Sequence, residues 1–128
     1  MKIILGIILL SASAFVFGQK KENCSEVKTG KFRLMDEEIG TTLIKRTKTK
    51  QIENNKELKV KAKYDVVWID DCTYQLKNPK RKKGDAKFIG EAGHVITEKI
   101  LWIEDGVMRV KSSANFADIV VESNIEVL

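Results

Sequence analysis

Few side chains in this sequence are of the types that carry out catalysis. His94 is the only histidine, and no serine stands in a nucleophile motif. Acid–base chemistry by paired carboxylates needs burial to raise the pKa of one of them, and the adjacent Asp70 and Asp71 are the best such pair. An acidic dipeptide at a turn more often accepts hydrogen bonds from backbone amides. We therefore expect structural roles for His94 and for both aspartates, and no enzyme activity.

The sequence predicts no metal or cofactor site. A calcium loop needs several oxygen ligands at tight spacing, which Asp70, Asp71 and Asp85 do not supply. The two cysteines, Cys24 and Cys72, lack the close spacing of a redox or zinc motif. In an exported protein, an even number of cysteines indicates a disulfide. We predict the Cys24–Cys72 bond, which in the chain-entropy model contributes roughly 4 kcal/mol to stability.

A compact cationic run is the strongest candidate for contact with a charged partner. Its basic residues are Lys77, Lys80, Arg81, Lys82 and Lys83. We interpret residues 77–85 as a loop because they include Pro79 and Gly84. Such a loop can contact phosphate, lipid headgroups or acidic glycans, and a simple solvated hairpin loop is the alternative. Nucleic-acid binding is not expected, because no stacking aromatic residue lies within the run.

Three large aromatic residues are candidates for lining a ligand cavity. They are Trp68, Tyr74 and Trp102. The alternative is that they only fill the interior of a small β domain, as aromatic side chains on inward strand faces commonly do. The segment from Ile100 to Ile103 is apolar on both faces, so it is either covered on both sides or in contact with a partner.

The first residues have the layout of a secretory signal peptide. Lys2 precedes an apolar block from Ile3 to Leu10, and small residues follow before Gly18. The block is too short to span a bilayer, which takes roughly 20 apolar residues. We expect cleavage after Gly18, no lipid attachment at Cys24 and no transmembrane anchor in the mature chain. Residues 1–18 are then the signal peptide and 19–128 a single β domain, which is periplasmic or secreted.

Alternating apolar and polar residues dominate the mature chain. The clearest run places Leu58, Val60, Ala62, Tyr64, Val66 and Trp68 on one face and Glu57, Lys59, Lys61, Lys63, Asp65 and Val67 on the other. A second run after Asp70 and Asp71 completes an antiparallel hairpin. Other strands are expected near 28–34, 41–54, 94–104, 107–111 and 119–127. Within 41–54, Ile44 and Ile52 are expected to be in one phase, on the same face of the sheet. Asp105 and Gly106 predict a tight hairpin turn. A short turn of helix fits within 86–93. Six or seven strands and no long amphipathic helix predict an all-β fold, a single antiparallel meander sheet curled into a small lipocalin-like barrel or half-barrel.

Several segments together resemble a family of small exported proteins of the Bacteroidota. The matching positions are Cys24, Lys28, Gly30, Trp68, Asp71, Cys72 and Tyr74, within CSEVKTGKF and WIDDCTYQL, and the resemblance spans most of the mature chain. It implies a lipocalin-like curled sheet and supports the pairing of Cys24 with Cys72. Some members carry an automatic topoisomerase label, which an exported chain of this size gives no reason to accept. The family has no established activity.

Two functions fit these observations. The first is an exported, non-catalytic binding module for a small apolar molecule. The alternative is a protein–protein interaction or inhibitor protein of the cell envelope that uses the basic loop, and the two differ in whether a bound molecule or a salt-sensitive protein partner accompanies the chain.

Overall fold

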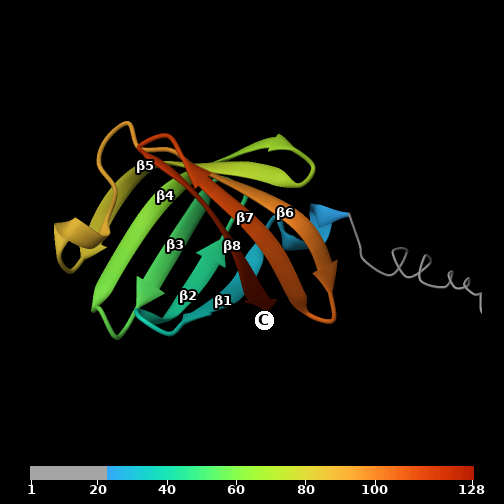
Figure 1. Cartoon of the computed structure of the whole chain (residues 1–128), viewed down its shortest axis with the longest axis horizontal. Coiled ribbons are helices and arrows are strands. Elements are labelled where there is room, and N and C mark those ends of the chain that lie inside the picture. The colour runs from blue at the N-terminus through green and yellow to red at the C-terminus, as the bar shows by residue number, and fades with distance from the viewer. Residues whose placement is uncertain (1–22) are drawn as a thin grey trace, which may run out of the picture.

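The computed structural model describes residues 23–128, so the predicted signal peptide, residues 1–18, lies outside the described residues. Eight antiparallel strands wrap into one barrel, each beside its sequence neighbours (Figure 1). They are β1 (Gly30–Asp36), β2 (Gly40–Arg46), β3 (Lys50–Asn55), β4 (Val60–Asp70), β5 (Thr73–Lys83), β6 (Ile96–Glu104), β7 (Val107–Ala114) and β8 (Ala117–Val127). Two 3-10 helices accompany them, η2 (Cys24–Val27) and η3 (Ala86–Phe88). The all-β prediction is confirmed, and the sheet closes through β1 and β8.

The alternation in the sequence becomes the inner and outer faces of the barrel wall. Along β4, Val60, Ala62, Tyr64 and Val66 are buried while the residues between them are not, because successive side chains of a strand point to opposite faces. Their apolar side chains join those of the other strands in one core. No helix within residues 23–128 has the length and hydropathy to cross a bilayer.

The predicted turns at two hairpins are confirmed. At the end of β4, the Asp70 carboxylate accepts the backbone N–H of Cys72 over 2.9 Å, which is the structural role expected of that aspartate. Between β6 and β7, Asp105 and Gly106 adopt φ angles of 53° and 74°. Positive φ at both central residues is what a tight two-residue hairpin requires.

The prediction that residues 77–85 form a loop is wrong. β5 continues through Pro79 to Lys83, and its pairing with β4 sets Lys80 opposite Lys63 and Lys83 opposite Lys61. Proline cannot donate a ladder hydrogen bond and is tolerated in a strand at an irregularity. The β4–β5 register shifts at that level of the hairpin. The basic residues therefore belong to the barrel wall and not to a free loop.

The prediction that Ile44 and Ile52 lie on the same face of the sheet is also wrong. A turn at residues 47–49, closed by a 2.9 Å bond from Thr47 N–H to Lys50 C=O, separates β2 from β3. Ile44 is buried in the core, whereas Ile52 is only half-buried. The inward positions of β3 belong to Gln51, Glu53 and Asn55, of which Gln51 and Asn55 are buried. The barrel consequently has eight strands and a partly polar interior.

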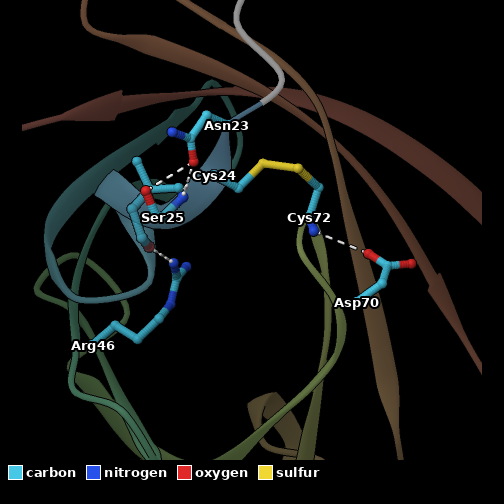
Figure 2. Close-up of a disulfide and its surroundings, with 7 residues drawn as sticks. Asn23, Cys24, Ser25, Arg46, Asp70 and Cys72 are labelled. Atoms are coloured by element: carbon cyan, nitrogen blue, oxygen red, sulfur yellow. Dashed lines mark hydrogen bonds between the residues drawn. A yellow bond between two sulfur atoms is a disulfide. The ribbon is translucent and has the colours of Figure 1, made fainter.

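One end of the barrel is plugged by η2. Cys24 and Val27 in this helix are each 1% exposed, and Cys24 is bonded to Cys72 at the β4–β5 turn, as predicted. Asn23 caps the helix by accepting the N–H of Ser25 (Figure 2). In Figure 1, η2 lies at the right-hand end of the barrel and η3 at the opposite end. We call the two ends the plugged end and the mouth.

Loss of the disulfide should loosen the plug. Replacing both cysteines with serine, Cys24→Ser with Cys72→Ser, should lower the free energy of unfolding by about 2–4 kcal/mol, because the unfolded chain then loses its cross-link over a separation of 48 residues. Urea denaturation of the oxidised protein and the double variant measures the difference. An unchanged transition midpoint would show that η2 is held without the bond.

Candidate functional site

A buried arginine organises the plugged end. Arg46, at the end of β2, is 2% exposed. Its Nε donates to Gln51 Oε1 over 2.8 Å and its Nη2 to the Tyr74 hydroxyl over 2.8 Å. Its Nη1 donates to the carbonyl of Val27 in the plug over 2.5 Å (Figure 2). The guanidinium also lies 4.4 Å from the centre of the Tyr74 ring and 4.6 Å from that of Phe32, a favourable position for a buried cation.

The three aromatic candidates do not line one hollow. Trp68 and Tyr74 pack against each other at the plugged end, with ring centroids 4.7 Å apart. Tyr74 is 1% exposed and bonded to Arg46. Trp102 stands opposite Arg109 in the β6–β7 ladder, at a position that faces outward because its ladder neighbours Ile103 and Met108 are buried in the core. Trp68, Tyr74 and Trp102 therefore do not line one cavity together, and a ligand site would have to be formed by other residues.

Two carboxylates face the middle of the barrel. Glu53 on β3 accepts a hydrogen bond of 2.8 Å from Gln51 Nε2. Glu98 on β6 accepts a hydrogen bond from the Ser112 side chain. Neither glutamate side chain is fully buried. Desolvation still has the largest effect on the pKa of each, because both carboxylates face the inside of the barrel. Desolvation raises the pKa of Glu53, and it raises the pKa of Glu98 to about 7, beyond the opposing effects of the hydrogen bond and of Arg46.

The barrel interior is hollow at the mouth. A space of about 340 Å³ lies beneath the segment that joins β5 to β6, comparable with the lower end of small-molecule pockets. Its lining combines the apolar and aromatic residues Tyr64, Leu76, Phe88, Ile89, Ile96 and Phe116 with the polar side chains of Lys87, Glu91 and His94. A second space of about 100 Å³ shares Tyr64 and Phe88 with it and includes Glu53. The shared residues make the two spaces neighbours, with the Glu53 carboxylate lining the smaller one.

The segment over this hollow is held by local bonds. Asp85 caps η3 by accepting the N–H of Lys87 over 3.0 Å. His94 Nδ1 accepts the N–H of Glu91 over 2.9 Å, and its ring stacks on Phe116 at 3.9 Å. These contacts give His94 the structural role that the sequence predicted. The predicted short helix within 86–93 is confirmed as η3.

The wall of the barrel is open beside the mouth. β1 and β8 pair over only three residues each, from Leu34 opposite Ile125 to Phe32 opposite Val127. Nearer the mouth, Ile119 and Val121 of β8 are 55% and 45% exposed, although Val121 stands opposite the inward-facing Ser112. Apolar side chains on an inner face are normally covered. The barrel therefore has a lateral opening as well as an open end.

Sequence reasoning missed the polar residues of the interior. Arg46, Gln51 and Glu53 lie in the segment where the turn at 47–49 was not foreseen, so their inward direction was hidden. Glu98 is in the same strand phase as Ile96 and Ile100, and this pattern was the available signal that it faces inward. Among residues 23–128, no three histidine, cysteine, aspartate or glutamate side chains cluster as metal ligands would.

Comparison with known proteins adds no relative. The chain matches no protein-family model, no curated protein and no solved structure. The resemblance to the exported family therefore stays a prediction, and the function must be inferred from the hollow, its lining and the charges around it.

Glu98 should make folding stability dependent on pH. Its pKa in the folded protein, about 7, lies above the ordinary value of 4.5, so the folded chain retains a proton that the unfolded chain releases. Stability should then decrease by about 2 kcal/mol between about pH 5 and about pH 8. Glu98→Gln should flatten this decrease, as measured by urea denaturation at both pH values.

A surface carboxylate provides the control. The pKa of Glu126 is lowered by its hydrogen bond and ion pair with Arg33, so Glu126→Gln should change the pH dependence only under acidic conditions. An equal slope in Glu98→Gln and in the unsubstituted protein would contradict the assignment of the raised pKa to Glu98.

Proposed function

We propose that this protein is an exported, non-catalytic binding module that holds a small, mainly apolar molecule in the hollow at the barrel mouth. The observation that carries the proposal is the space of about 340 Å³ lined by aromatic and aliphatic side chains together with Lys87, Glu91 and His94. A concave apolar site with a few placed polar groups is the usual form of a small-molecule site. The opening between β1 and β8 offers an additional route into it.

The polar groups of the interior favour a ligand with one polar end. Tyr64 and Phe88 connect the mouth hollow to the smaller space that contains Glu53. A hydrogen-bond donor of the ligand could reach the Glu53 carboxylate while the apolar part stays among the mouth residues. Arg46 is less suited to hold an anionic group, because Val27, Gln51 and Tyr74 already accept from its three nitrogens.

Export is supported by two features of different kinds. Residues 1–18 have the composition of a signal peptide, and the Cys24–Cys72 disulfide is typical of proteins in oxidising compartments. We place the mature protein in the periplasm or outside the cell. The proposed family resemblance agrees with this location.

Filling the hollow should weaken ligand binding. Ile96 lines the hollow and is half-buried, so Ile96→Trp would place a bulky indole ring in the space. We expect an anilinonaphthalene sulfonate dye to bind the unsubstituted protein with a dissociation constant in the micromolar range, and to bind Ile96→Trp at least about tenfold more weakly, a loss of about 1.4 kcal/mol. Fluorescence titration measures both.

The control adds the same ring outside the barrel. Val67 is 44% exposed on β4 between inward neighbours, so Val67→Trp should leave dye affinity unchanged. Equal weakening in both variants would indicate a general loss of structure. No dye binding by the unsubstituted protein, together with a native mass from the source organism equal to that of the polypeptide alone, would contradict the proposal.

A further inference from the structure

We propose that one side of the mouth docks on a phospholipid bilayer with anionic headgroups and presents the hollow to it. Seven basic residues gather there, and we call them the basic rim: Lys61 and Lys63 on β4, Lys80, Arg81, Lys82 and Lys83 on β5, and Lys87 in η3. The pairing of β4 with β5 places four of them side by side, since Lys63 stands opposite Lys80 and Lys61 opposite Lys83. The continuation of β5 as a strand creates this surface.

Most charges of the basic rim are exposed and none belongs to an ion pair with another described residue, although Lys80 lies close enough to Asp65 to act on it electrostatically. Its residues on β5 and in η3 are exposed. The ion pairs found within residues 23–128 use Arg33, Lys50 and Arg109, all outside the rim. Arg81 donates to the carbonyl of Gly84 over 3.1 Å, which engages the guanidinium but leaves its charge. A surface of this kind attracts anionic surfaces and repels cationic ones.

An exposed aromatic ring stands beside these charges. Phe88 is 45% exposed, lines the mouth hollow, and its ring centre lies 5.1 Å from Lys87 Nζ. Phe116, on the β7–β8 turn, is 47% exposed and lines the same hollow. Basic side chains around exposed apolar rings match a bilayer surface, where the charges meet headgroups and the rings enter the boundary of the acyl chains.

A bilayer fits this surface better than a single bound anion does. The basic side chains spread over two strands and a helix, and lysine is a mobile point charge suited to mobile headgroups. Of the acidic residues at the mouth, Asp36, Glu37 and Glu38 lie at the end of β1 and in the β1–β2 turn, four strands away from β5 around the barrel. Asp85 and Glu91 lie in the segment between β5 and β6, where the seven basic residues of the rim outnumber them. The barrel should therefore tilt its β4–β5 side toward the membrane, which brings the hollow to the lipid surface.

Vesicle binding by the ligand-free protein tests the docking. We expect sedimentation with vesicles of phosphatidylcholine containing one quarter phosphatidylglycerol, weaker sedimentation with phosphatidylcholine alone, and loss of binding in concentrated salt. The triple variant Lys80→Gln, Arg81→Gln, Lys83→Gln should lower the partition coefficient at least about tenfold, since each basic residue near an anionic surface contributes roughly fivefold. Circular dichroism verifies that each variant is folded.

A matched triple variant removes the same charge elsewhere. Lys31, Lys99 and Lys111 are exposed and lie outside the basic rim, so Lys31→Gln, Lys99→Gln, Lys111→Gln should keep most of the binding. The Phe88→Trp variant reports insertion of this ring into the bilayer. On addition of the anionic vesicles, its fluorescence emission should shift to shorter wavelength by more than the emission of the unsubstituted protein does. Equal loss in both triple variants would overturn the proposal, because net charge and not the basic rim would then govern binding.

Two further outcomes would also overturn it. The first is retention on a heparin column without vesicle binding, which would make the rim a site for polyanions. The second is vesicle binding without any shift in Phe88→Trp, which would place the contact away from the mouth. Dye binding to the hollow is measured without vesicles, so failure of the proposed ligand site and failure of membrane docking give different results.

Discussion

The buried guanidinium of Arg46 is the interaction on which the rest of the structure depends. Through three nitrogens it joins β2 to Gln51 of β3, to Tyr74 of β5 and to the backbone of η2. An arginine in an apolar interior is stable only when its donors are satisfied. Here every acceptor belongs to a different element, so the charge can be accommodated only when the plug and the barrel wall are assembled. The disulfide ties η2 covalently to Cys72 in the β4–β5 turn, next to the start of β5.

This arrangement makes the two ends of the barrel different. At the plugged end, aromatic rings and the arginine fill the interior, and Phe32, Tyr74 and Met108 are each at most 1% exposed. At the mouth, side chains leave a hollow, and β8 separates from β1. Glu53 and Glu98 lie between these regions, and Arg46 acts on both carboxylates electrostatically. The interior therefore combines a fixed positive charge, two carboxylates and an apolar entrance.

The sequence was sufficient for the strands whose pattern was regular and insufficient where the chain departs from it. The alternation from Val60 to Val66, the turn at Asp105 and Gly106 and the cysteine pair were predictable, because each depends on local residues or on an even cysteine count. The strand through Pro79 was not, since its composition favours a loop and only pairing with β4 keeps it extended. The candidate site was not predictable either. The hollow depends on which side chains leave space unfilled, and the inward direction of Arg46 and Glu53 depends on an unforeseen turn.

Amide hydrogen exchange with and without a bound anilinonaphthalene dye tests most directly the claim that ligands enter at the mouth. Exchange reports local opening of backbone hydrogen bonds. We predict that the dye slows exchange in residues 85–95 and 117–124, which border the hollow and the lateral opening, and leaves η2 (Cys24–Val27) unchanged. Slower exchange confined to η2 and the β4–β5 turn would contradict the account, because the ligand would then occupy the plugged end.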